Sequence, residues 1–149
     1  MKVRIVAIGR MQDDAMAELV ERYRRRIPFE VELVEKVVRG RRGGRDAEAD
    51  LIESQIGSGD FVIALDERGR DLASRDLATR MGRLRDEGRG TVSVIVGGAD
   101  GLAERLRLRA DLLLAFGRAT WPHMLVRVML MEQLYRASSI LGGHPYHRD

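Results

Sequence analysis

Short apolar runs rich in β-branched residues alternate along the chain with segments of helical spacing. The runs Val3–Ile8, Phe61–Leu65 and Thr91–Val96 contain few polar residues, which predicts strands buried on both faces. Each run is followed by a stretch in which apolar residues recur every three or four positions, as in an amphipathic helix. Strands that alternate with helices form parallel sheets. The pattern therefore predicts one α/β domain, residues 1–149, with a mostly parallel sheet.

Further segments complete the predicted order of elements. Phe29–Val34 alternates apolar and charged residues, which predicts a strand with one solvated face, and Leu112–Phe116 is a short apolar segment. The expected helices span Ala15–Arg25, Ala47–Ile56, Leu72–Glu87, Leu102 to about Arg109, and His123–Leu141. Ser74 is a candidate N-terminal cap of the third helix, and Gly88 is expected to end it. The basic, glycine-rich stretch 35–46 predicts a mobile loop.

Composition narrows the classes of function. The chain has no run of eighteen apolar residues and no signal-peptide cleavage site near its start, so we expect no membrane span and a cytoplasmic protein. The absence of cysteine excludes disulfides, thiolate metal sites and thiol nucleophiles. The three histidines have no carboxylate at ligand spacing, so no metal is expected.

The cationic charge is almost entirely arginine and lies in two clusters. One cluster is Arg22, Arg24, Arg25 and Arg26, and the other is Arg39, Arg41, Arg42 and Arg45. Guanidinium groups are better suited than lysine to bidentate contact with phosphate, which fits an anion-binding surface. A solvated helix face followed by a flexible loop explains the same pattern, and the net charge of +3 does not separate the two interpretations. The clusters alone predict anion binding and nothing more specific.

Three segments of unusual sequence follow predicted strands, at the edge where α/β sheets bind ligands. They are Leu65–Gly69, Gly97–Gly101 and Phe116–Pro122. The glycines after Val96 permit close approach of a ligand to the backbone, although a plain tight turn is the commoner role of such a pair. A dinucleotide site of an oxidoreductase is a rival interpretation. The segment departs from the GxGxxG pattern, however, and does not follow the first strand.

The final predicted helix carries polar groups at its start and apolar residues on two sides. Pro122 is suited to the first turn, and His123 and Arg127 lie one turn apart near the positive end of the helix dipole. The apolar stripes are Met124, Val128, Met131 and Tyr135, and Leu130, Leu134, Ala137 and Leu141. Two stripes predict packing against both the sheet and a partner subunit, while a fully buried core helix has the same pattern.

The chain ends in a segment, residues 144–149, that contains two histidines, a tyrosine and an arginine around Pro145. Aromatic, imidazole and guanidinium groups together can stack on a base and hold phosphate, which predicts contact with RNA. The alternative is an unimportant polar tail, because chain ends are commonly frayed.

These segments, together with the opening strand, resemble one known family along the whole chain. The matching blocks are LDERG at 65–69, VGGADGL at 96–102, WPHMLVRVMLMEQLYRA at 121–137 and HPYHR at 144–148. They are similar to the ribosomal RNA large-subunit methyltransferase H family of the SPOUT superfamily. Members of that family methylate N3 of a pseudouridine in 23S rRNA on the assembled ribosome. The short, arginine-rich loop 35–46 is a departure from the family pattern.

The resemblance implies a deep trefoil knot in the C-terminal part, which is an exception to the rule against threaded chains. It also implies S-adenosylmethionine bound in the knot and an obligate homodimer. The cofactor positions that carry over are Leu65, Gly97, Phe116, Gly117, Arg118, Ala119, Thr120 and Trp121. The main chain of the last six residues is expected to hold the adenine.

Methylation at N3 requires loss of a proton, so a general base or a stabilising cation is expected. The candidates for proton handling are His123, His144 and His147, and Tyr146 is expected to stack on the base or hydrogen-bond to it. The candidate RNA contacts are Arg4, Arg127 and Arg148. In a homodimer, the tail of one subunit is expected to complete the site of the other. A catalytically silent RNA-binding module is the alternative, and the intact cofactor loop argues against it.

Overall fold

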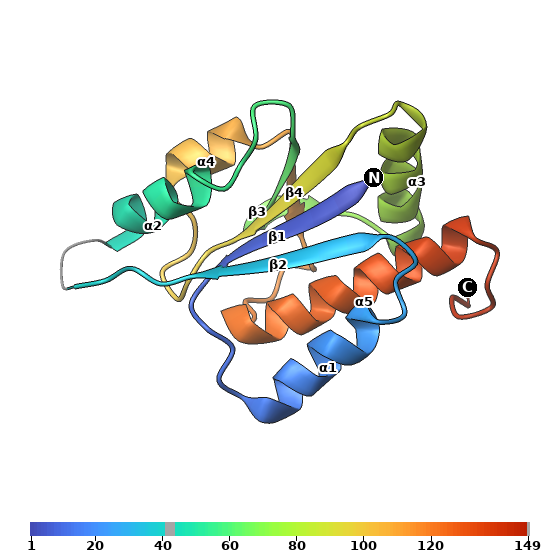
Figure 1. Cartoon of the computed structure of the whole chain (residues 1–149), viewed down its shortest axis with the longest axis horizontal. Helices are drawn as coiled ribbons and strands as arrows, with labels where there is room; N and C mark the ends of the chain where they lie inside the picture. The colour runs from blue at the N-terminus through green and yellow to red at the C-terminus, as the bar shows by residue number, and fades with distance from the viewer. Residues whose placement is uncertain (41–43, 149) are drawn as a thin grey trace.

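Five strands form the central layer of the structure, a computed structural model that describes residues 1–40 and 44–148 (Figure 1). They are β1 (Lys2–Ile8), β2 (Glu30–Lys36), β3 (Phe61–Asp71), β4 (Thr91–Val96) and β5 (Leu112–Ala115). Neighbouring strands are parallel, and their order across the sheet is β2-β1-β4-β3-β5. The predicted α/β class and the predominance of parallel pairing are confirmed.

Helices cover both faces of this sheet (Figure 1). One face carries α1 (Asp14–Arg24), α3 (Ser74–Asp86) and α5 (His123–Leu141), and the other carries α2 (Gly44–Glu53) and α4 (Glu104–Arg109). The alternation of side chains along a strand explains the two layers. Val3 and Ile5 of β1 pack with the first group of helices, whereas Val6 and Ile8 pack with the second. Because β1 is covered on both sides, its sequence is apolar apart from Lys2 and Arg4.

Local signals set the helix ends, with one correction. The Asp13 carboxylate accepts a hydrogen bond of 2.9 Å from the Met16 N–H, and this cap starts α1. The predicted cap at Ser74 is wrong, because Ala73 occupies the cap position and no side chain caps α3. The Ser74 hydroxyl instead donates to Gln133 Oε1 at 2.8 Å, which joins α3 to α5.

The ends of the predicted mobile loop, residues 35–46, belong to regular elements. β2 continues to Lys36, and α2 begins at Gly44, three residues before the predicted start. Residues 41–43 of that loop lie outside the described residues. Within residues 1–40 and 44–148, no helix has the length and apolar character needed to cross a membrane.

β3 runs beyond Leu65, where the sequence pattern placed its end. Leu65 and Arg70 both pair with Leu114 of β5, so residues 66–69 bulge out of the ladder before the strand resumes. Gly69 then passes very close to β5. A Cβ atom on Gly69 would lie 2.6 Å from the Leu114 carbonyl carbon, which explains the need for glycine at this position.

We predict that Gly69→Ala lowers the free energy of unfolding by about 1–3 kcal/mol, because the added methyl group must push β3 away from β5. Gly59→Ala is the matched control, since nothing lies within 4 Å of a Cβ atom there. Urea denaturation of the two variants and the wild type measures the difference. Equal midpoints for both variants would contradict the close approach of β3 and β5.

Candidate functional site

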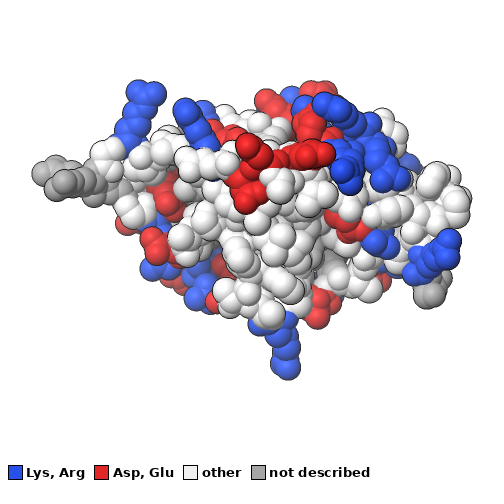
Figure 2. All heavy atoms as spheres, turned by 90° about the horizontal axis from the view of Figure 1, so that it is seen from below, with Lys and Arg blue, Asp and Glu red and all other residues white. Residues whose placement is uncertain are grey.

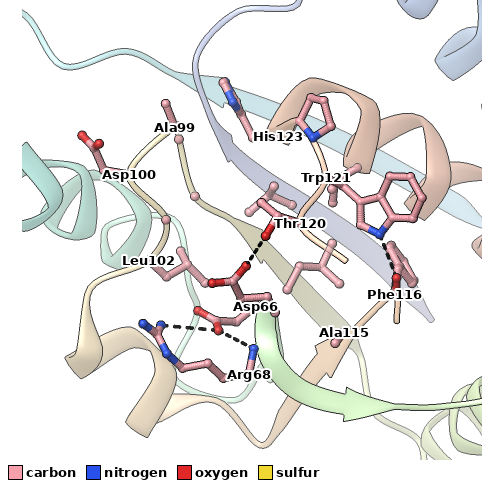
Figure 3. A pocket seen from close by; sticks show the side chains of 18 of the residues that line it. Asp66, Arg68, Ala99, Asp100, Leu102, Ala115, Phe116, Thr120, Trp121 and His123 are labelled. Carbon is pink, nitrogen blue, oxygen red and sulfur yellow. Dashed lines mark hydrogen bonds and ion pairs between the residues drawn. The ribbon is translucent and has the colours of Figure 1, made fainter. Parts of the chain in front are cut away.

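A cavity of about 410 Å³ opens at the carboxyl ends of β3, β4 and β5 (Figure 3). The three segments expected at this edge form most of its wall, as residues 65–68, 96–102 and 114–122. The first turn of α5 adds His123 and Val126, and α2 adds Arg45. The volume is typical of small-molecule sites. Sequence reasoning therefore located this edge correctly.

The loop after β4 presents backbone to the cavity. Gly98 and Gly101 form a bridge across it, and Gly101 has a φ of +76°, a conformation that other residues rarely adopt. A Cβ atom on Gly97 would lie 2.6 Å from the Gly101 carbonyl carbon, so only glycine fits there. The tight turn that the sequence offered as the commoner role is thus present, and the close approach of a ligand to this backbone stays a prediction.

The loop from Phe116 to Trp121 is held at both ends by side-chain hydrogen bonds. The Trp121 indole N–H donates to the Phe116 carbonyl at 2.8 Å, which closes the loop on itself. The Thr120 hydroxyl donates to Glu67 Oε2 at 2.9 Å and ties the loop to the β3 bulge (Figure 3). Every predicted cofactor residue of this loop lines the cavity except Arg118. These hydrogen bonds therefore restrict the main-chain conformation of the loop.

Carboxylates of β3 support this wall, and sequence reasoning missed their role. Asp66, whose side chain is 6% exposed, accepts from the Arg68 N–H at 2.9 Å and lies 3.9 Å from an Arg107 nitrogen. Asp71 accepts from the Gly117 N–H at 3.2 Å. The available signal was the position of these residues at a strand end. That signal identifies the edge of the sheet, but it does not identify the groups to which these carboxylates bond.

His123 lies at the cavity wall, as expected for a residue that handles protons there (Figure 3). Burial lowers the pKa of its imidazole from the ordinary value of about 6.5, and the positive charge of Arg127 lowers this pKa further. The side chain is therefore neutral at neutral pH. A neutral imidazole carries a lone pair that can accept a proton.

The surroundings of Arg127 argue against its predicted contact with RNA. Arg127 is 2% exposed, and its two terminal nitrogens donate to Glu35 Oε2 at 2.7 Å and to the Ile8 carbonyl. Such a guanidinium presents no face to a phosphate. The spacing placed it one turn from His123 correctly, but the helical period could not tell which of the two groups faces the cavity.

Arg4 is also committed to the protein, which argues against its predicted contact with RNA. Its side chain donates to Glu32 Oε2 at 3.0 Å and to the Gln55 carbonyl at 3.1 Å, and it lies 3.5 Å from Asp60. These partners come from β2 and from the segment between α2 and β3. Arg4 therefore links elements at the end of the sheet opposite to the cavity.

The tail follows the C-terminal end of α5 and folds back along the helix as far as Glu132. Glu132 lies nine residues from His123, which is about 14 Å along the helix axis. The Tyr146 ring packs on Tyr135 with 4.6 Å between ring centroids, and its hydroxyl donates to Glu132 at 3.1 Å. Burial, followed by hydrogen bonds and charges of Tyr23 and Glu132, raises the pKa of Tyr146. His147 Nδ1 lies 3.1 Å from an Arg136 nitrogen.

The structure therefore separates the predicted catalytic residues, together with the predicted RNA contact Arg148, into two groups within one chain. His123 lines the cavity, whereas His144, Tyr146, His147 and Arg148 do not. The tail contacts Glu132 and Arg136 of α5, which also form an ion pair with each other. In the described part of the chain, no group of three or more His, Asp or Glu side chains is arranged to hold a metal ion.

Comparison with known proteins places this geometry in a family. A family model described as "Predicted SPOUT methyltransferase" matches residues 1–147. The chain is 49% identical over 151 residues to a protein of Rhodospirillum centenum named Ribosomal RNA large subunit methyltransferase H, and it covers 99% of both chains. Proteins of the same name from Cereibacter sphaeroides and Bradyrhizobium diazoefficiens are 50% and 44% identical, again with 99% of both chains covered.

Solved structures show the same fold at low sequence identity. A probable methyltransferase from Bordetella pertussis superposes with a TM-score of 0.60 and 17% identity, and the match covers 92% of this chain and 96% of that one. The tRNA (m1G37) methyltransferase from Aquifex aeolicus superposes with a TM-score of 0.55 and 14% identity, over 99% of this chain and 74% of that one. The family model matches almost the whole length of this chain. The chain therefore belongs to the SPOUT methyltransferase family.

Proposed function

We propose that the protein transfers a methyl group from S-adenosylmethionine to N3 of a pseudouridine in 23S rRNA of the large ribosomal subunit. The observation that carries this proposal is identity of 44–50% over 99% of both chains to proteins named Ribosomal RNA large subunit methyltransferase H. The substrate would place the reaction with the ribosome, so the expected cytoplasmic location belongs to the same proposal.

The cavity suits S-adenosylmethionine in shape and in chemistry. Its wall combines apolar side chains such as Leu65 and Leu114 with exposed main chain of the loops 97–101 and 116–121. Main-chain N–H and C=O groups can recognise the edge of an adenine, and Gly97 keeps the first loop free of side chain. When bound, the cofactor supplies an electrophilic methyl group on a sulfonium. The trefoil knot expected for the superfamily would be formed by these same C-terminal segments.

His123 is the residue of this chain best placed to accept the N3 proton. It lies at the wall of the cavity, and its lowered pKa keeps it in the neutral form that can act as a base. In-line displacement at a methyl group otherwise requires only that the attacking nitrogen be exposed and correctly positioned. The bulge of β3 and the closed loop 116–121 provide rigid walls for that positioning.

The arginines nearest the cavity are the better candidates for phosphate contacts. Arg45 and Arg68 line it, and the Arg68 side chain is 61% exposed. The cluster on α1 is largely neutralised within its own helix: Arg24 pairs with Glu21 at 2.9 Å, and Arg22 pairs with Glu18 at 3.5 Å. That favours a solvated helix face for the first cluster. Arg148, which is exposed, remains a candidate contact in the tail.

A homodimer would reunite the two groups of predicted catalytic residues. Figure 2 views the face that carries α1 and α5, where a broad uncharged area is framed by charged side chains. A groove there is lined by apolar and aromatic residues, among them Leu19, Tyr23, Val128 and Met129. A second copy packed on this face would cover the groove. The tail of each subunit, with His144, Tyr146, His147 and Arg148, would then reach the cavity of the other.

We predict that Gly97→Ala weakens binding of S-adenosylhomocysteine at least about tenfold, which corresponds to 1.4 kcal/mol, because its Cβ atom would displace the Gly101 backbone. Calorimetric titration measures the affinity, and Gly59→Ala is the control. Wild-type protein that binds neither this ligand nor S-adenosylmethionine would favour the RNA-binding module. Binding of NAD instead would favour the oxidoreductase.

The rRNA assignment is tested by mass mapping of methyl groups on 23S rRNA from a strain that lacks the gene. We expect one methylated pseudouridine to lose its methyl group, and we expect it to regain the group with the wild-type gene but not with Gly97→Ala. A methylation pattern that is unchanged by deletion of the gene would remove the assignment.

Co-expression of two inactive chains tests the composite site. One chain lacks residues 144–149, and the other carries Gly97→Ala. Half of randomly assembled dimers would be mixed, and each would hold one intact cavity facing one intact tail, so we expect about a quarter of the wild-type methylation. Each chain expressed alone is the control. Absence of recovery would mean that cavity and tail of the same chain act together.

A further inference from the structure

A charged side chain is buried directly behind the cavity wall. Arg127 is among the largest fully buried side chains of the protein, although it belongs to the second turn of a helix whose first turn lines the cavity. Burial of a permanent charge is unfavourable unless the charge is paired and hydrogen-bonded. The Nε atom of Arg127 has no hydrogen-bond partner among the described residues. Apolar packing alone would be served better by an aliphatic residue.

The partners of Arg127 lie at the carboxyl ends of two strands. Its terminal nitrogens donate to the Ile8 carbonyl at the end of β1 and to Glu35 Oε2 near the end of β2. The same Glu35 oxygen accepts a 2.6 Å hydrogen bond from the Met11 N–H. One ion pair, between the buried Arg127 and the partly exposed Glu35, therefore joins the start of α5 to β1, to β2 and to the segment that follows β1.

His123 takes part in the same close contact. Gly9, with a φ of +92°, lets the chain after β1 pass directly beneath the first turns of α5. A Cβ atom on Gly9 would lie 3.7 Å from Arg127 Nη2 and 4.0 Å from His123 Nε2. The imidazole and the guanidinium thus face the same small region, and the ion pair fixes the helix turn that carries both.

Two carboxylates of the β3 bulge at the cavity are engaged by other groups of the protein. Asp66 is close to Arg68 and Arg107, and Glu67 accepts from Thr120. The remaining charged residues at the cavity wall are Arg45 and Asp100. Among all these charges, Arg127 is the one that lowers the pKa of His123, in addition to burial. Burial lowers the pKa of Arg127 itself, and Glu35 raises it in opposition.

We propose that Arg127 is a positioning residue, held by Glu35, that fixes His123 at the cavity wall as a neutral proton acceptor. This inference rests on the proposed function, in which His123 takes the proton from N3. In that step the N3–H bond breaks and the proton goes to the imidazole. N3 gains the methyl group, and the electrons of the broken sulfur–carbon bond stay on sulfur. A neighbouring fixed cation keeps the imidazole free of a proton before the substrate arrives.

The test is an NMR titration of the histidine side chains in wild-type protein, R127Q and E35Q. Removal of the Arg127 charge should raise the pKa of His123 toward about 6.5. Removal of the Glu35 charge leaves Arg127 uncompensated and should lower the same pKa below its wild-type value. The signal of His123 is assigned by its absence in H123Q. The control variants R24Q and E21Q remove the same two charges from an exposed ion pair on α1. Those two control variants should leave His123 unchanged.

Opposite shifts in R127Q and E35Q would support the inference, and equal or absent shifts would overturn it. If R127Q does not fold, the direction of the His123 pKa shift in E35Q decides whether the inference holds. R127K keeps the positive charge and should therefore keep the low pKa of His123. The folded protein binds this proton less tightly than the unfolded chain does. The free energy of unfolding should therefore fall as the pH drops below about 6.5, and it should fall less steeply in R127Q.

The pH profile of methyl transfer to large subunits from the deletion strain separates this inference from the proposed function. R127Q should move the acid limb of activity to higher pH in step with His123. Shifts in the NMR titration without a shift in the acid limb would overturn the role of His123 as proton acceptor. The absence of any methyl transfer by wild-type protein would overturn the proposed function, while the NMR titration would still decide what Arg127 does to His123.

Discussion

Parallel pairing of β1, β3 and β4 is the constraint on which the rest of the structure depends. Because these strands are buried on both faces, helices must cover the sheet above and below, and every connection returns to the same end of the sheet. All carboxyl ends therefore meet at one edge. The bulge of β3 and the segments that follow β4 and β5 meet there, and between them they enclose the cavity.

Glycine at a few positions allows these segments to pack closely and to line the cavity with main chain. Gly69 lets β3 resume beside β5 after its bulge, and Gly97 lets the loop after β4 fold onto itself. Neither position admits a Cβ atom without movement of backbone. A cavity lined by backbone recognises a ligand through fixed N–H and C=O groups, and such groups lose little conformational freedom when a ligand binds.

The helix α5 connects two electrostatic clusters that differ in character. Near its start, the buried Arg127 pairs with the partly exposed Glu35 among strand ends beside His123. In its second half, Arg136 and Glu132 hold the aromatic tail against the helix. The helix separates the two clusters within one chain, and the proposed homodimer would bring the tail of one subunit to the cavity of the other.

The sequence by itself determined the α/β class, the run of alternating elements, the full extent of α5 and the edge at which the cavity lies. These features follow from the spacing of apolar residues and from the positions of glycine, because both determine the local conformation of the chain. Tertiary structure alone decided that β3 resumes after Leu65, that Ser74 bonds Gln133 rather than capping α3, and that Arg127 turns inward while His123 faces the cavity. Helical spacing places two residues on one face, but whether that face meets solvent or strand ends depends on elements distant in the chain. A surface arginine and an arginine buried in an ion pair look the same in the sequence. Only the packed structure distinguishes the two environments.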